Sequence, residues 1–190
     1  MEDAQKKSKK RWGTWALLGI LGVLLLLKFF VIDIYAVPQA GMWPTISAGG
    51  RFLGLRHPYR DPSQVRRGDV IIFWRKLPDG QKYQYVWRVV GLPGDRVEVA
   101  GDVVKVNGKE LLRDKVRDEG KLTIYREHNG EAVYEVAYPS APDGDVFVPP
   151  QLSLTVPSGE FFVLGDNRHA AQDSRYEGPV PFGQILARKL

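Results

Sequence analysis

Two hydrophobic patterns divide this chain into an N-terminal segment and a body. Residues 12–32, WGTWALLGILGVLLLLKFFVI, would be apolar on every side of a helix and contain a single charge, Lys28. A helix of this length extends about 31 Å, close to the hydrocarbon thickness of a bilayer. From Asp33 onward, apolar and polar residues alternate in short runs, which is the period of strands. We therefore expect one transmembrane helix at 12–32, followed by a mainly β domain at 33–190.

Three interpretations of the apolar segment compete. A buried core helix would carry a polar face, which this segment lacks. A cleaved signal peptide would have a shorter apolar stretch and a small-residue cleavage site, and Pro38 and Gln39 fit such a site badly. An uncleaved signal anchor agrees best with the pattern. The basic residues within 1–11 then predict a cytoplasmic tail and place the domain on the outer side of the membrane.

Short β-branched runs bounded by Gly, Pro and Asp predict the strands of the body. The clearest are residues 68–74, 83–90 and 161–164, and residues 97–111 are expected to form three short strands joined by turns. We expect an antiparallel system of coiled sheets, in which 97–158 form a β sub-domain.

Two dipeptides predict tight hairpins within that sub-domain. Asn107-Gly108 and Asn129-Gly130 each lie between alternating runs, and both central residues of a type I′ turn need positive φ. The Pro-rich stretch from Ala141 to Gln151 is expected to be a loop.

Charge and composition narrow the range of functions. Of the net charge of +5, residues 1–11 contribute +3, so the body is nearly neutral, which argues against a nucleic-acid surface. The chain has no cysteine, which excludes disulfides and thiolate chemistry. Its three histidines, His57, His128 and His169, are too far apart in sequence to show ligand spacing. We expect no metal, no cofactor and no nucleic acid partner.

Three segments of the body together resemble the conserved boxes of bacterial type I signal peptidases, peptidase family S26. They are VPQAGMWPTI (37–46), YVWRVVGLPGDRVEV (85–99) and FVLGDNRHAAQDSRYEGPVP (162–181), in the family's order and just after an anchor. The third box is the most specific. The resemblance implies the signal-peptidase fold and a single-pass protein of the bacterial inner membrane, with its N-terminus in the cytoplasm.

In that family, a serine before the Met of the first box attacks the peptide bond that follows a signal sequence. A lysine before the Arg of the second box is the general base, and it needs an apolar setting to be neutral. A further serine helps the oxyanion site, and another orients the lysine. The matching positions in this chain are Gly41 for the nucleophile, Trp87 for the base, Gln39 for the oxyanion serine and Ala171 for the lysine-orienting serine.

All four polar groups of the chemistry are therefore missing, whereas the residues expected to form the scaffold of the site are present. Those residues are Met42, Pro44, Thr45, Arg88, Asp166, Asn167, Arg168, Asp173, Ser174 and Arg175. We expect ion pairs between Arg88 and Asp166 and between Asp173 and Arg175. Trp87 is expected to fill the apolar pocket of the family's lysine, and Gly41→Ser is expected to be almost neutral for stability.

Loss confined to the catalytic positions favours a pseudo-peptidase, which binds signal-peptide-like or secreted-protein segments at the membrane without cutting them. The alternative is an active signal peptidase with a non-standard nucleophile such as Ser47, Thr45 or Ser174, and with Lys76 or Lys82 as base. A structural subunit that pairs with an active paralogue is the third hypothesis.

Overall fold

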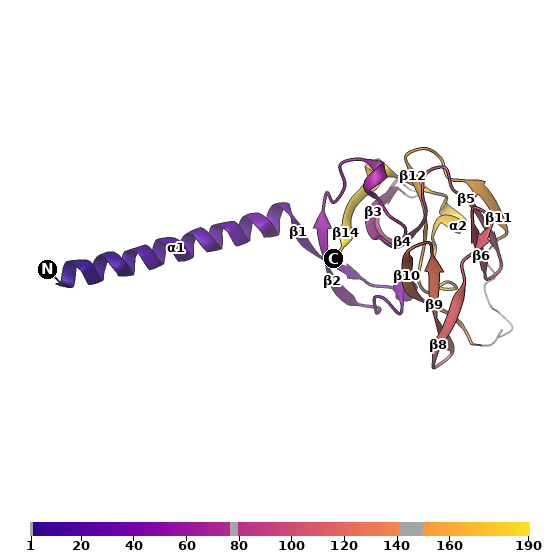
Figure 1. Ribbon diagram of the computed structural model, residues 1–190, viewed down its shortest axis with the longest axis horizontal. Helices are drawn as coiled ribbons and strands as arrows, with labels where there is room; N and C mark the ends of the chain where they lie inside the picture. Colours follow the sequence, from indigo (N-terminus) through magenta and orange to yellow (C-terminus); the bar gives the residue numbers. More distant parts are fainter. Residues whose placement is uncertain (1, 77–79, 141–149) are drawn as a thin grey trace.

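The structure is a computed structural model, which describes residues 2–76, 80–140 and 150–190. The side chains of residues 2–11 and 27–30 lie outside this description, as does most of the loop predicted from Ala141 to Gln151. The body is mainly β, as the alternating pattern predicts (Figure 1).

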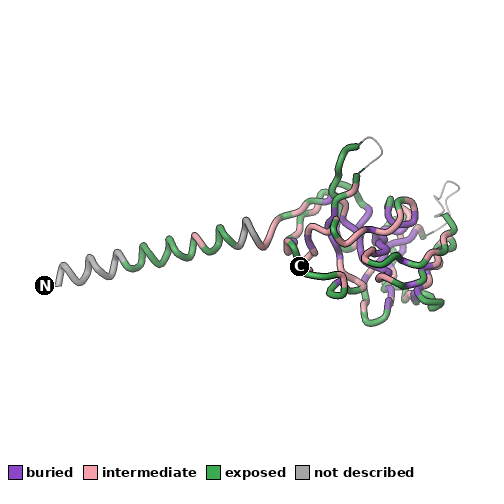
Figure 2. Tube along the Cα trace, turned by 90° about the horizontal axis from the view of Figure 1, so that it is seen from above, coloured by how far each residue is buried: buried purple, intermediate pink, exposed green. Residues whose placement is uncertain are grey.

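The N-terminal helix α1 (Glu2–Phe30) projects away from the β-rich body (Figure 1). Its described side chains, residues 12–26, are nearly all exposed, whereas buried residues gather in the body (Figure 2). The segment predicted at 12–32 is helical up to Phe30, but Ile32 already belongs to the first strand, so the predicted end lies too far along the chain. Within the described residues, no helix combines the length and apolarity that define a membrane span. The anchor therefore stays a prediction.

A seven-stranded sheet forms the larger part of the body, and its neighbouring strands are antiparallel. In spatial order its strands are β1 (Ile32–Val37), β2 (Gly50–Arg56), β14 (Ile185–Lys189), β3 (Val70–Lys76), β4 (Lys82–Gly91), β12 (Glu160–Leu164) and β13 (Val180–Pro181). The three strands predicted most clearly correspond to β3, β4 and β12. The C-terminal strand β14 lies between β2 and β3, which no local pattern indicates.

Two smaller sheets complete the body, and both come from the segment between β4 and β12. One has the order β11 (Leu152–Thr155), β5 (Arg96–Ala100), β6 (Val103–Val106) and β7 (Lys109–Glu110). The other has the order β10 (Ala132–Pro139), β9 (Leu122–Asn129) and β8 (Arg113–Glu119). Short helical turns connect the strands: η1 (Ala40–Met42), η2 (Pro62–Gln64), α2 (Ser174–Glu177) and η3 (Phe182–Gln184).

The two predicted hairpins differ in detail. Asn107 and Gly108 have φ of 54° and 76°, so this turn has the two positive φ angles that the dipeptide predicts. Asn129, however, is the last residue of β9, and the two turn residues are Gly130, with φ of 65°, and Glu131. Asn129 is held in the strand because its buried side-chain amide donates to the Val90 carbonyl oxygen at 2.9 Å. A glycine at the first central position alone is typical of a type II′ turn.

Candidate functional site

Gly41 lies in η1, immediately after β1, and its backbone is tied to the loop that follows β12. The Gly41 carbonyl oxygen accepts the Asn167 N–H at 3.0 Å, and the Asn167 side-chain amide donates to the Ala40 carbonyl oxygen at 3.2 Å. The next residue, Met42, is fully buried and anchors η1 in the core. The first and third boxes are therefore in direct contact.

Trp87 lies on β4, and its indole occupies the space beside Gly41. A Cβ atom built on Gly41 would lie 2.6 Å from Cη2 and 2.7 Å from Cζ3 of the indole, closer than carbon atoms approach without displacement. A Cβ on Gly165 would meet the same ring at 2.9 Å and the Ala171 Cβ at 2.2 Å. Trp87 is only 7% exposed, and its indole thus requires glycine-sized residues at positions 41 and 165.

This packing corrects the expectation that Gly41→Ser would be almost neutral. The backbone of Gly41 lies outside the left-handed region, so its conformation admits any L-residue. The obstacle is the indole, which takes the volume of the side chain. The structure brings positions 41, 87 and 171 together, and Gln39 lines the groove beside them.

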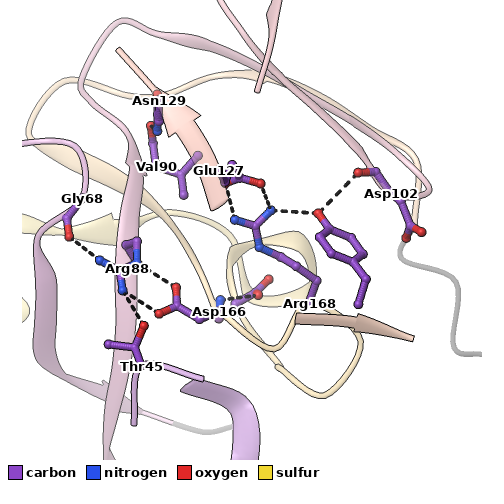
Figure 3. Close-up of polar contacts among 12 residues, drawn as sticks. Thr45, Gly68, Arg88, Val90, Asp102, Glu127, Asn129, Asp166 and Arg168 are labelled. Carbon is purple, nitrogen blue, oxygen red and sulfur yellow. Dashed lines mark hydrogen bonds and ion pairs between the residues drawn. The ribbon is translucent and has the colours of Figure 1, made fainter. Parts of the chain in front are cut away.

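Arg88 points to the other side of β4 from Trp87 and makes a two-pronged ion pair with Asp166, as predicted (Figure 3). Arg88 Nε donates to Asp166 Oδ1 at 2.7 Å and Nη2 donates to Oδ2 at 2.6 Å. The guanidinium also donates to the Gly68 carbonyl oxygen at 2.7 Å and to Thr45 Oγ1 at 3.0 Å. Burial acts to lower the pKa of Arg88, but Asp166 outweighs it and the pKa is raised, so the guanidinium stays charged.

The second predicted pair joins Asp173 to Arg175, and it also fixes the start of α2. Arg175 Nε and Nη2 each donate to the Asp173 carboxylate at 2.8 Å. The same carboxylate accepts the Gly165 N–H at 2.8 Å and caps α2 through the Arg175 N–H at 3.2 Å. The Ser174 hydroxyl accepts the Val163 N–H at 3.0 Å, so it is engaged in holding β12.

A third buried ion pair, between Arg168 and Glu127, was not anticipated. Both side chains are almost completely inaccessible, and Arg168 Nη1 donates to Glu127 Oε2 at 2.7 Å while Nη2 contacts Oε1 (Figure 3). Nη1 also donates to the Tyr138 hydroxyl at 3.0 Å. Burial acts to lower the pKa of Arg168, but the Glu127 carboxylate raises it well above its ordinary value. This pair joins the third box to the three-stranded sheet.

Of the residues considered as a replacement dyad, Ser174 is buried, and the others lie on exposed segments. Ser47 is exposed in the turn before β2, and Lys76 and Lys82 face each other across the exposed end of the β3–β4 hairpin. Across residues 12–26, 31–76, 80–140 and 150–190, no lysine is among the buried charged residues. The same part of the chain contains no cluster of three or more metal-ligating side chains.

A groove of about 310 Å³ opens beside the indole, between the end of β1 and the first half of β4. Its walls include Val37, Gln39, Tyr85, Trp87 and Gln172. A second cavity of about 440 Å³ lies next to it and shares Ala36 and Gln84 with the groove. Both cavities therefore border the same gap between β1 and β4.

Comparison with known proteins agrees with the three boxes. The chain matches the profile "Signal peptidase, peptidase S26" over residues 9–190. It is 33% identical to signal peptidase I of Bacillus caldolyticus over 183 residues, covering 96% of this chain and 91% of that protein. It is 32% identical to signal peptidase I of Pseudomonas aeruginosa over 174 residues, covering 83% of this chain but only 59% of that protein. A crystal structure of a signal peptidase I from Enterococcus faecalis is 29% identical and covers 66% of this chain and 96% of that one, with a TM-score of 0.38. The chain therefore belongs to the signal peptidase family, peptidase S26.

Proposed function

We propose that this chain is a membrane-anchored signal peptidase homologue that binds extended segments of signal peptides or secreted proteins without cleaving them. One observation carries the proposal: the Trp87 indole fills the space beside Gly41 so tightly that even a Cβ atom at position 41 would lie 2.6 Å from the ring. In the family that space holds the nucleophile and its base. Here it is packed as a core.

The chemistry of the two residues supports inactivity. Glycine offers no group that attacks a peptide bond, and the indole N–H is a donor that cannot accept a proton. In subtilisin, loss of the nucleophile alone lowers the rate by a factor of about 10⁶, because the catalytic groups act as a unit. A replacement base needs a desolvated lysine, and Lys76 and Lys82 are both exposed.

The edges of β1 and of the first half of β4 face the gap, and they support peptide binding. β1 pairs with β2 alone among the described strands, and β12 pairs with β4 only from Arg88 to Gly91. The bond from the Arg56 N–H to the Val31 carbonyl oxygen sets the alternation of β1, so the backbone groups of Ile34 and Ala36 face the gap. Unpaired strand edges of this kind bind extended peptides by strand addition.

The backbone of β4 presents matching groups across the gap. The bond from the Val89 N–H to the Asp69 carbonyl oxygen sets the alternation on this strand, so the backbone groups of Gln84 and Val86 point away from β3. A segment that enters the gap therefore meets donors and acceptors on both sides and would join the sheet between β1 and β4.

The anchor is part of the proposal because α1 exposes large apolar side chains, among them Trp12, Trp15 and Leu24. We expect the basic tail in the cytoplasm and residues 33–190 outside, as the positive-inside rule predicts. Protease added to intact spheroplasts should digest the body. Full protection of the body, with digestion only after lysis, would contradict this topology.

The first test of the proposed function is cleavage. The full chain in non-ionic detergent, mixed with a preprotein in equal amount, should leave the preprotein intact by mass spectrometry, whereas an active signal peptidase I trims it. A trimmed product that disappears in the Ser47→Ala variant would instead establish the alternative, an active enzyme with a non-standard nucleophile.

The second test is binding in the gap, measured with a synthetic peptide of about nine residues that alternates Val and Ser. Ala36→Pro removes the N–H that faces the gap and leaves the bonds of β1 to β2 in place, because proline is tolerated where a strand N–H faces away from its ladder. This variant should bind the peptide about fivefold to tenfold more weakly, the value of one hydrogen bond. Ala36→Ser, which keeps the N–H, is the matched control. Equal affinity of the two variants would place the peptide elsewhere.

A further inference from the structure

Ala36 and Gln84 line both cavities beside the gap, but the other β3 and β4 side chains that identify each cavity come mainly from opposite faces of the sheet that an inserted strand would complete. Trp74 and Gln84 are directly opposite each other on β3 and β4, so their side chains share a face, and both line the 440 Å³ cavity. Tyr83, Tyr85 and Trp87 alternate with Gln84 along β4 and line the 310 Å³ groove on the other face. Successive side chains of an inserted strand would therefore enter the two cavities in turn.

The groove on the Trp87 face is aromatic and apolar at its floor. Tyr85 and Trp87 have ring centroids 6.3 Å apart, and Val37 lies in the opposite wall. This surface suits an apolar side chain, because burial of apolar area against it is favourable.

The cavity on the other face is lined by charged and aromatic side chains. Asp33, Tyr35 and Trp74 form part of its wall, together with Arg56 and His57. The Asp33 carboxylate accepts the Ile34 N–H at 2.8 Å and lies 3.9 Å from Arg56 Nη1. The Ile34 N–H is one of the groups that face the gap, so Asp33 now occupies a position that the carbonyl oxygen of an inserted strand would take.

From these contacts we propose that the bound segment alternates apolar side chains, placed against Trp87, with basic side chains, placed against Asp33. The inference rests on the proposed strand insertion. When a carbonyl oxygen of the incoming strand takes the Ile34 N–H, the Asp33 carboxylate is released at the mouth of the cavity and pairs with a lysine or arginine. Aromatic walls add attraction for a cation. Arg56 Nη1 lies 3.9 Å from the Asp33 carboxylate, beyond hydrogen-bond distance, and the Asp33 side chain is 48% exposed, so an incoming ammonium or guanidinium can make a closer contact to the carboxylate.

The test uses three peptides of about nine residues in which Val alternates with Lys, Glu or Ser. The repeat makes the result independent of register. Titrated into the full chain in non-ionic detergent, the Lys peptide should bind about fivefold more tightly than the Ser peptide, and the Glu peptide more weakly than either. The chain itself carries a net charge of +5, so non-specific attraction would produce the reverse order.

Asp33→Asn should abolish the advantage of the Lys peptide and leave the affinity for the Ser peptide unchanged. Asp114→Asn, at an exposed aspartate on β8, is the matched control and should preserve the advantage. Equal binding of the Lys and Ser peptides, tighter binding of the Glu peptide, or an advantage that survives Asp33→Asn would overturn the inference and leave the proposed function standing. Failure of all three peptides to bind would refute strand insertion itself.

Discussion

Glu127→Ala is expected to lower the free energy of unfolding by about 3–5 kcal/mol, because it strands the buried guanidinium of Arg168. Both partners of this pair are almost fully inaccessible, and among residues 12–26, 31–76, 80–140 and 150–190 the Tyr138 hydroxyl is the one side-chain acceptor left to Arg168 in the variant. The measurement is unfolding of the full chain by denaturant. The midpoint of the transition should move to a lower denaturant concentration, and the dependence of the unfolding free energy on denaturant concentration should stay unchanged.

The matched control is Glu135→Ala on the neighbouring strand β10. Glu135 pairs with Arg117 at 2.9 Å, but their side chains are 35% and 42% exposed, so the loss should be much smaller than for Glu127→Ala. Equal losses for the two variants would mean that the buried pair contributes no more than a surface pair.

Trp87→Lys is expected to cost about 3–5 kcal/mol as well, because it replaces a buried indole with a smaller side chain and buries an amine. Burial disfavours the charged form, so the pKa of the new lysine should be depressed in the folded state. The unfolded chain then binds more protons, and the stability of this variant should rise with pH up to the ordinary lysine pKa of about 10.4.

Trp74→Lys is the control for this second prediction. Trp74 is 37% exposed on β3, so its replacement should cost far less and should show no such rise with pH. If Trp87→Lys were as stable as the unmodified protein at neutral pH, the prediction would be wrong, and the pocket around position 87 would still accept a lysine.

Local patterns were sufficient for the most clearly alternating strands and for the first hairpin. β3, β4 and β12 follow from alternation, and Asn107-Gly108 follows from the φ angles that its turn requires. The second hairpin was displaced by one residue because the Asn129 side chain bonds to Val90, far away in sequence. A rule based on two adjacent residues cannot account for a hydrogen bond to a residue so distant in the sequence.

The ion pairs also divide into those that the sequence predicts and one that only the fold reveals. Arg88–Asp166 and Asp173–Arg175 followed from the family's boxes, since both partners lie within them. Glu127 lies outside every box. On the same strand its neighbour Arg126 is exposed, and the local sequence does not indicate which of these two charged residues is buried. Only the fold, which brings β9 against the third box, identifies Glu127 as the partner of Arg168.

The relation between positions 41 and 87 was also beyond the sequence. Each substitution could be read separately as the loss of one catalytic group. The structure makes them interdependent, because the indole occupies the volume in which a side chain at 41 would lie, and Gly165 and Ala171 complete the same packing. The glycine at position 41 and the tryptophan at position 87 are thus two sides of one packed contact.

The most direct test of this account is a double-mutant cycle that combines Gly41→Ala with Trp87→Leu. Gly41→Ala alone should cost about 1–3 kcal/mol, because its Cβ overlaps the indole. With leucine at position 87 the overlap with the ring is gone and only the 3.2 Å approach to the Ala170 carbonyl oxygen remains, so the same change should cost less by at least about 1 kcal/mol, which is the expected coupling. The effect of alanine on the unfolded chain is common to both backgrounds and cancels. The same cost for Gly41→Ala in both backgrounds would contradict this, because it would show that the indole does not occupy the space of a side chain at position 41.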